Sequence, residues 1–181
     1  MSGFTHLGDT VLHTGHVISL SRSQFQAPDG TLFERDVVRH PGAVSVVPLL
    51  ESNEVVLVRQ YRAAIDQMVL EIPAGKRDVP GEPTEETAQR ELIEEVGYSA
   101  SRLDLLARFH NSIGFSDEES FVYLGRDLRE QPMDRQGIEE SFMEIICVPL
   151  ADTPSMIADG VITDAKTVIG LTLALALLSG S

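Results

Sequence analysis

Residues 75–98 read GKRDVPGEPTEETAQRELIEEVGY and form the most informative stretch of the chain. Pro83 is tolerated in the first turn of a helix, and Gly97 is a typical C-terminal stop. Between them, three apolar residues share one helical face at four-residue spacing: Ala88, Leu92 and Val96. The sequence therefore predicts a helix over residues 83–96 with one apolar stripe.

A second stripe of this helix is acidic. Glu91, Glu94 and Glu95 fall on a separate arc about 100° wide. Like charges four residues apart, such as Glu91 and Glu95, destabilise an isolated helix by roughly 0.2–0.5 kcal/mol. A hard divalent cation such as Mg²⁺ would offset this crowding, because it binds carboxylate and phosphate oxygens. Helix geometry alone leaves a solvated acidic face as the alternative.

The flanking regions read mainly as strands. Residues 26–30 are a turn signal, and residues 43–50 and 55–58 predict a hairpin with a buried face. A last helix is predicted over residues 164–178. The remaining expected strands cover residues 11–20, 32–38, 69–72, 103–110, 120–124 and 142–148. This mixture predicts the α+β class, a mostly β body with helices packed on it.

Composition narrows the classes of function. The 181 residues suit one domain, and a formal charge of −14 argues against a general nucleic-acid binder. The single cysteine, Cys147, lies in an apolar run and is expected to be a small buried residue in a reducing compartment. The apolar run 168–178 is too short for a bilayer, and the N-terminus lacks signal-peptide blocks. We therefore expect a cytoplasmic protein without a membrane partner.

The acidic helix lies in a longer pattern that resembles the Nudix box. Residues 90–98, RELIEEVGY, fit its second half without a mismatch, and Glu82 stands at the expected place before Arg90. Six residues separate Gly75 from Glu82 where the usual pattern has five. The resemblance implies a Nudix fold, in which helices sandwich a mixed β-sheet body.

The same resemblance implies roles for the matched residues. Glu91 and Glu95 would be the main ligands of Mg²⁺ or Mn²⁺, with Glu94 assisting as a metal ligand and catalytic residue. The carbonyl of Ala74 would be a backbone ligand. Glu82 and Arg90 would form a pair that ties the loop to the helix.

Further segments are similar to the ADP-ribose pyrophosphatase branch of the family. They are VRQYR at residues 58–62, LEIPAG at 70–75 and FERDVVRHPGAV at 33–44. In that branch, arginines matching Arg62 and Arg35 contact substrate phosphates, which suits the planar guanidinium fork. Glu71 would contact substrate or support the metal site. The implied reaction is hydrolysis of ADP-ribose to AMP and ribose 5-phosphate.

A general base is also implied, on a loop that precedes a late strand. The matching residues 136–141 read QGIEES, and either Glu139 or Glu140 could take the proton of the attacking water. The sequence does not choose between them.

The sequence leaves two alternatives for the function open, and the resemblance also implies an oligomeric state. Ile113 stands where the ADP-ribose branch usually has a proline, which leaves a nucleotide-sugar such as GDP-mannose as a rival substrate. A non-catalytic nucleotide-binding Nudix module is the rival from another class. The resemblance also implies a homodimer, with residues 1–40 as an N-terminal antiparallel β extension for dimerisation and residues 41–181 as the Nudix hydrolase domain.

Overall fold

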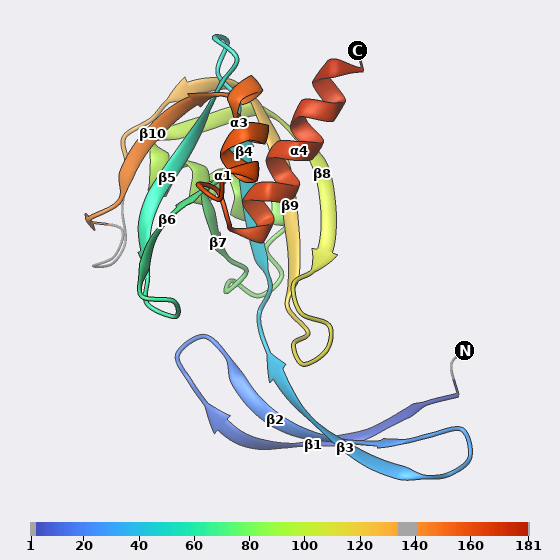
Figure 1. Ribbon diagram of the computed structural model, residues 1–181. Coiled ribbons are helices and arrows are strands. Elements are labelled where there is room, and N and C mark those ends of the chain that lie inside the picture. The colour runs from blue at the N-terminus through green and yellow to red at the C-terminus, as the bar shows by residue number, and fades with distance from the viewer. Residues whose placement is uncertain (1–2, 134–140, 181) are drawn as a thin grey trace. The chain divides into compact units, whose positions relative to one another are not determined.

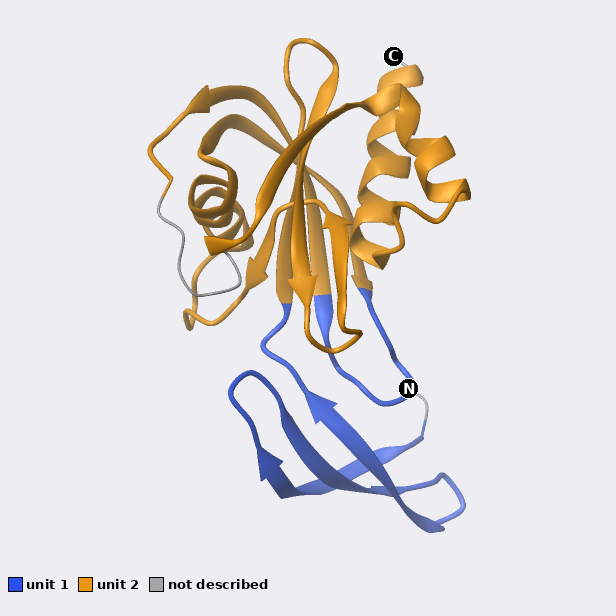
Figure 2. Cartoon of the chain, turned by 60° about the vertical axis from the view of Figure 1, so that its left-hand side comes forward, with its two compact units in different colours: residues 1–42, 110–119 blue, residues 43–109, 120–181 orange. Residues whose placement is uncertain are grey.

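The computed structural model describes residues 3–133 and 141–180, and the chain divides into two compact units (Figure 2). The first contains residues 1–42 together with 110–119. The second contains residues 43–109 and 120–181. Figure 1 labels the elements of both.

The first unit is built on a three-stranded antiparallel sheet in the order β1-β2-β3. The strands are β1 (Thr5–Thr14), β2 (Ser19–Gln26) and β3 (Leu32–Arg39). The predicted strand over residues 11–20 is divided between β1 and β2, because the chain turns where Gly15 N donates to the carbonyl of Ile18 at 2.8 Å. Residues 110–119 join this unit through a hydrogen bond from Val38 N to the Phe115 carbonyl.

The second unit contains two sheets, in the orders β10-β5-β6 and β7-β4-β9-β8. β4 pairs with β9 in parallel and with β7 in antiparallel orientation, so the second sheet is mixed. The strands are β4 (Ala43–Pro48), β5 (Glu54–Arg62), β6 (Gln67–Glu71), β7 (Ala74–Lys76), β8 (Tyr98–His110), β9 (Glu119–Glu130) and β10 (Glu144–Pro149).

The predicted hairpin over residues 43–50 and 55–58 is wrong. Its two halves became β4 and β5, which belong to different sheets and share an isolated bridge between Leu49 and Val55. β4 has β7 on one edge and β9 on the other, so neither edge is open to β5. The apolar pattern identified both strands but could not tell which neighbours would pair with them.

Two helices cover the strands from opposite sides (Figure 2). α1 (Thr84–Val96) packs with Val44 and Val46 of β4, and α4 (Ala165–Ser179) packs with Val47. Successive side chains of a strand point to opposite faces, which is why β4 serves both cores. The structure is therefore α+β with a helix-sandwiched sheet body, as predicted.

The helix ends follow from local sequence. Pro83 precedes α1, and Gly97 ends it in the left-handed conformation at φ 71°. Asp164 caps α4 by accepting from Thr167 N at 2.9 Å. Two short elements were not predicted: η1 (Leu150–Asp152) and α3 (Thr153–Ala158). Among the described residues, the helices all fall short of the length and apolarity that crossing a membrane demands.

The expectation of a buried Cys147 is also wrong. Cys147 is exposed on β10, whereas its neighbours Ile146 and Val148 pack against the core. β10 is the edge strand of its sheet, and alternation along a strand turns every second residue outward. An apolar run thus marked the strand correctly but not the direction of each side chain.

Candidate active site

Glu91 of α1 lies against the backbone of Gly75 in β7. A Cβ atom added to Gly75 would lie 1.8 Å from Cδ of Glu91 and 2.0 and 2.2 Å from its two carboxylate oxygens. The carboxylate therefore occupies the space that any other side chain at position 75 would fill. With any other residue at position 75, the Glu91 carboxylate would have to move away from the strand.

Glu95, one turn further along α1, is held by the same strand. Its side chain is buried, at 4% exposure, and its Oε2 accepts a hydrogen bond from Ala74 N at 2.9 Å. A backbone N–H is a fixed donor, so β7 orients this carboxylate. The structure thus brings Glu91 and Glu95 against Gly75 and Ala74 of β7. The predicted role of these residues as metal ligands stays a prediction.

Arg90 is the counter-charge of the acidic stripe. Its Nη1 lies 2.8 Å from Glu91 Oε1 and 3.2 Å from Glu94 Oε2. Its Nη2 lies 3.5 Å from Glu82 and 3.8 Å from Asp78. Burial acts to lower the pKa of Arg90, but Glu91, Glu82 and Glu94 raise it above its usual value. Among the described ion pairs, these four carboxylates share one guanidinium, so their formal negative charge exceeds its single positive charge.

Glu82 has a second partner that fixes it before the helix. Its Oε2 accepts from Thr87 Oγ1 at 2.7 Å, and this bond, together with Arg90, lowers the pKa of Glu82. The loop is thereby tied to the first turns of α1. This geometry agrees with a structural pairing of Glu82 and Arg90.

A divalent cation fits the chemistry of this donor set. Carboxylate oxygens are the ligands that Mg²⁺ and Mn²⁺ prefer, and the space above Gly75 is filled by one of them. Within residues 3–133 and 141–180, no three Asp, Glu, His or Cys side chains already converge on one point. Arg90 lies against Glu91 and Glu94, so a cation would bind there in competition with its guanidinium.

A second charged cluster surrounds Glu71 at the end of β6. Glu71 is 1% exposed, and its two oxygens each accept from Arg62, through Nε and Nη2 at 2.6 Å. Lys166 Nζ donates to the same carboxylate and lies 3.0 Å from Asp164. The bond to Glu71 is the main cause that raises the pKa of Arg62.

Asp164 joins this cluster from the start of α4. Burial acts to raise the pKa of Asp164, but the charge of Lys166 and hydrogen bonds from Thr167 and Lys166 lower it below its usual value. Sequence reasoning missed Asp164 and Lys166 as members of the site region. The Asp-x-x-Thr pattern at Asp164 indicated the start of a helix. It gave no sign that Lys166, in the first turn of that helix, contacts Glu71, which lies 95 residues earlier in the chain.

The other predicted residues have different surroundings. Arg35 lies in the first unit, where its guanidinium stacks 4.9 Å from the Phe33 ring centroid and donates to the Glu34 carbonyl. Ile113, also in the first unit, is 83% exposed. Glu139 and Glu140 lie outside the described residues.

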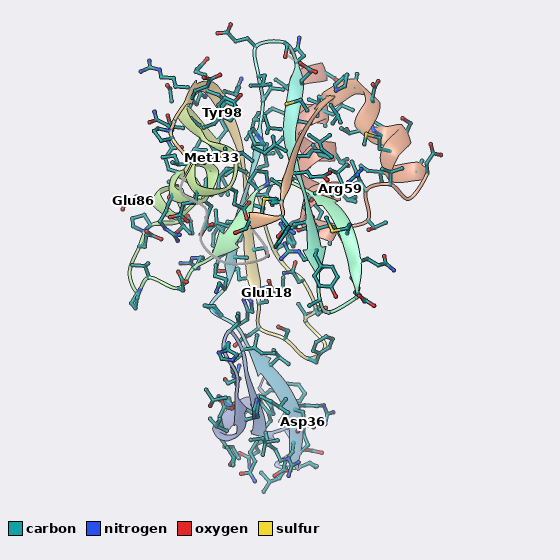
Figure 3. All side chains as sticks on the ribbon, turned by 90° about the vertical axis from the view of Figure 1, so that its left-hand side faces the viewer. Asp36, Arg59, Glu86, Tyr98, Glu118 and Met133 are labelled. Atoms are coloured by element: carbon teal, nitrogen blue, oxygen red, sulfur yellow. The ribbon has the colours of Figure 1, made fainter. Side chains whose placement is uncertain are left out.

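A depression at the C-terminal end of α1 is lined by Tyr98 and Met133, which are labelled in Figure 3. Its lining also includes Val96, Gly97, Glu130 and Gln131. Its described lining residues include one carboxylate and no cationic side chain. It therefore lacks the groups that a diphosphate would need, and the charged clusters described above remain the candidate site.

Comparison with known proteins agrees with this geometry. The chain is 36% identical over 156 residues to an ADP-ribose pyrophosphatase of Bacillus subtilis, covering 86% of this chain and 84% of the relative. It is 36% identical over 177 residues to an ADP-ribose pyrophosphatase of Mycobacterium tuberculosis, covering 98% and 86%. It is also 30% identical over 156 residues to a GDP-mannose pyrophosphatase of Cronobacter sakazakii, covering 78% and 81%.

The fold has a solved counterpart as well. A crystal structure described as an ADP compounds hydrolase superposes with a TM-score of 0.83 at 23% identity, covering 98% of this chain and 95% of that one. The model of the NUDIX domain matches residues 39–168, which include both charged clusters. On this match and the 36% identical relatives, the chain belongs to the Nudix family.

Proposed function

We propose that the protein hydrolyses the diphosphate linkage of ADP-ribose to AMP and ribose 5-phosphate, in a reaction that requires a divalent cation. The observation that carries this proposal is the seating of Glu91 and Glu95 against β7, which places two carboxylates of one helix on adjacent backbone positions, Gly75 and Ala74. The choice of ADP-ribose as substrate rests on the two 36% identical relatives, which are named ADP-ribose pyrophosphatases.

The cation would be held by Glu91 and Glu95, with Glu94 and the Ala74 carbonyl as further ligands. Mg²⁺ and Mn²⁺ both suit these oxygens. When bound, such an ion lowers the pKa of a water and neutralises charge that develops on the phosphate oxygens. Arg90 donates hydrogen bonds to both Glu91 and Glu94, so it would have to give up these two carboxylates when the cation binds.

Arg62 is proposed to bind the diphosphate. Two of its nitrogens donate to Glu71, and its side chain remains 42% exposed. Glu71 therefore acts as the group that orients the guanidinium, while the exposed edge faces a ligand. Arg35 is proposed as a second phosphate contact, on the resemblance of residues 33–44 to the ADP-ribose branch.

The general base is proposed to be Glu139 or Glu140. The experiment replaces each with Gln and measures turnover of ADP-ribose at saturating Mg²⁺. Loss of turnover in one variant identifies the base. Near-normal rates in both variants would rule out this assignment.

The function is tested by phosphate release from ADP-ribose coupled to a phosphatase, with Mg²⁺, with Mn²⁺ and with chelator. We expect turnover that depends on the added ion. A protein that binds ADP-ribose without metal-dependent turnover of any nucleoside diphosphate derivative would instead be a nucleotide-binding module.

GDP-mannose is the second candidate substrate. It is favoured by the exposed Ile113 in place of proline and by the 30% identical GDP-mannose pyrophosphatase. A side-by-side kcat/KM for ADP-ribose and GDP-mannose decides between them. A higher kcat/KM for GDP-mannose would make GDP-mannose the preferred substrate, and the proposed cleavage of a diphosphate linkage would still hold.

A homodimer built on the N-terminal extension, residues 1–40, is also proposed. Every residue of β1 is exposed, and this unit presents a set of large apolar side chains: Phe4, Leu7, Val11, Leu12, Val17, Ile18 and Leu32. Apolar surface of this kind favours association. Light scattering should give twice the chain mass, and a Leu7→Glu and Val11→Glu double variant should be monomeric; a monomeric wild type would reject the dimer.

A further inference from the structure

Gln60 of β5 is a buried side chain with an unused donor. It is 5% exposed, and its amide Nε2 has no hydrogen-bond partner among the described residues. Gln89 of α1 provides the contrast, because its amide donates to and accepts from the backbone of Ala100. Buried polar groups are usually paired, so an unpaired amide next to a binding site points to a ligand.

The strand register places Gln60 on the face that carries the Glu71 cluster. Gln60 pairs with Val69, and Arg62 pairs with Gln67, two positions along the same antiparallel ladder. Residues directly opposite one another share a face, and alternate residues of one strand do so as well. Gln60 therefore lies between Val58, which pairs with Glu71, and Arg62, which reaches back to Glu71.

Gln60 lies at the end of the pairing between β5 and β10. The ladder between β10 and β5 ends with Glu144 opposite Arg59, one residue before Gln60. Arg59 itself is on the other face of β5 and is exposed (Figure 3). The Glu71 carboxylate already accepts three cationic N–H groups, from Arg62 and Lys166. Gln60 Nε2 donates neither to this carboxylate nor to any other described acceptor, so its partner would have to come from elsewhere.

We infer that Gln60 is a substrate-binding residue whose amide donates to a non-bridging oxygen of the diphosphate group bound by Arg62. The inference rests on the proposed function, since it takes the diphosphate as ligand. Phosphate oxygens act only as acceptors, and an amide N–H beside a guanidinium complements them without adding charge. The amide supplies a directional contact at a position that the paired Arg62 cannot also occupy.

The test is a Gln60→Met variant, which keeps the length of the side chain and removes the donor. Binding of α,β-methylene ADP-ribose, a non-hydrolysable analogue, should weaken about 10-fold by calorimetry, the effect of one hydrogen bond. The melting temperature should stay equal to wild type or rise, because an unpaired buried donor is removed. Gln89→Met is the matched control: it should lower the melting temperature and leave analogue affinity unchanged.

The outcomes separate the inference from the proposed function. If wild type hydrolyses ADP-ribose and Gln60→Met binds the analogue as tightly as wild type, the inference is overturned and the function stands. A melting temperature that falls as in Gln89→Met, with unchanged affinity, also overturns it. If wild type lacks turnover, affinity for inorganic pyrophosphate is compared instead, and equal values in both proteins reject the inference. Gln60→Leu replaces Gln60→Met if the latter does not fold.

Discussion

The second unit contains two charged clusters whose charge balance differs. Around Arg90, four carboxylates share one guanidinium. Around Glu71, two carboxylates, Glu71 and Asp164, meet two cations, Arg62 and Lys166. Counted over the described residues, the first cluster has an excess of negative charge that could attract a cation, and the second has equal numbers of positive and negative groups.

The two clusters also differ in burial. Glu71 is almost fully buried, whereas the carboxylates around Arg90 remain partly exposed. A buried charge is tolerated only when it is paired and hydrogen-bonded, so the Glu71 carboxylate can be buried because Arg62 and Lys166 pair with it. An unbalanced cluster must stay where a counter-ion can reach it. We infer that the metal binds at Glu91 and Glu94 of the Arg90 cluster together with Glu95, and that the Glu71 cluster holds Arg62 in place.

The largest effect is expected on stability, from a substitution that disrupts the neutral cluster around Glu71. Glu71→Gln removes the buried negative charge and leaves Arg62 and Lys166 without their shared partner. The free energy of unfolding should fall by about 3 kcal/mol, typical for loss of one member of a buried pair. Urea denaturation at neutral pH measures it. Glu51→Gln, at an exposed turn, should change stability little.

A loss below about 1 kcal/mol for Glu71→Gln would contradict the comparison, because a surface ion pair gives that much. The cluster would then not depend on its charge balance. Arg62 would need another explanation for its fixed orientation.

The second largest effect is expected on activity, from a substitution in the cluster around Arg90. Glu91→Gln should lower kcat/KM for ADP-ribose about 100-fold and weaken Mg²⁺ binding. Replacing a residue that only orients a metal ligand typically costs about 10- to 100-fold in metal affinity or activity, and loss of a ligand itself should cost at least the upper value. The melting temperature should not fall, since one of several like charges is removed. Glu86→Gln, on the exposed side of α1 (Figure 3), should retain full activity.

If Glu91→Gln were instead to lose several kcal/mol of stability with unchanged metal binding, the two clusters would have exchanged roles. Calorimetric Mg²⁺ titration and thermal unfolding on the same samples distinguish these outcomes.

A smaller effect on the same cluster is expected from Gly75→Ala. The new Cβ would overlap the Glu91 carboxylate, so this side chain must move away from β7. We expect kcat/KM to fall about 10-fold, since displaced groups lose part of their binding and positioning. Gly114→Ala is the control, because a Cβ there meets nothing within 4 Å. Activity close to wild type in Gly75→Ala would show that the seat above Gly75 is dispensable.

The smallest effect concerns the cap of α4. Asp164→Ala removes the acceptor for Thr167 N and one member of the neutral cluster, and should cost about 1 kcal/mol at neutral pH. The folded-state pKa of Asp164 lies below the usual 3.8. Its stabilisation is therefore complete above that value and is lost as pH falls through the lowered pKa.

Thermal unfolding from neutral to strongly acidic pH checks this prediction. The difference between wild type and Asp164→Ala should shrink as the carboxyl is protonated. A difference that grows in acid would reverse the sign and reject the assigned pKa direction.

Much of α1 could be predicted because its information is local. The apolar spacing, Pro83 and Gly97 gave a helix over residues 83–96, and the observed helix is Thr84–Val96. The last helix was predicted over 164–178 and spans Ala165–Ser179, behind the Asp164 cap. Periodicity and capping act within one or two turns, so sequence alone can reveal them.

The errors concern contacts rather than elements. Cys147 lies in a correctly predicted strand but faces outward, and β4 and β5 are correctly placed strands that do not form a hairpin. Lys166 was assigned to a helix without any sign that it would reach Glu71. Each error arises because pairing between distant strands and helices is not encoded in local pattern.

The sequence by itself determined the acidic helix, its boundaries and the family pattern that predicts metal-dependent hydrolysis, because these depend on spacing along a few turns. Only the tertiary structure showed how the charges of each cluster are paired, that the Glu91 carboxylate fills the space beside Gly75, and that Gln60 has an unused donor. Those features depend on which surfaces meet when sheets and helices pack. Charge balance and close approach are properties of the packed interior, where residues far apart in the chain share one low-dielectric space.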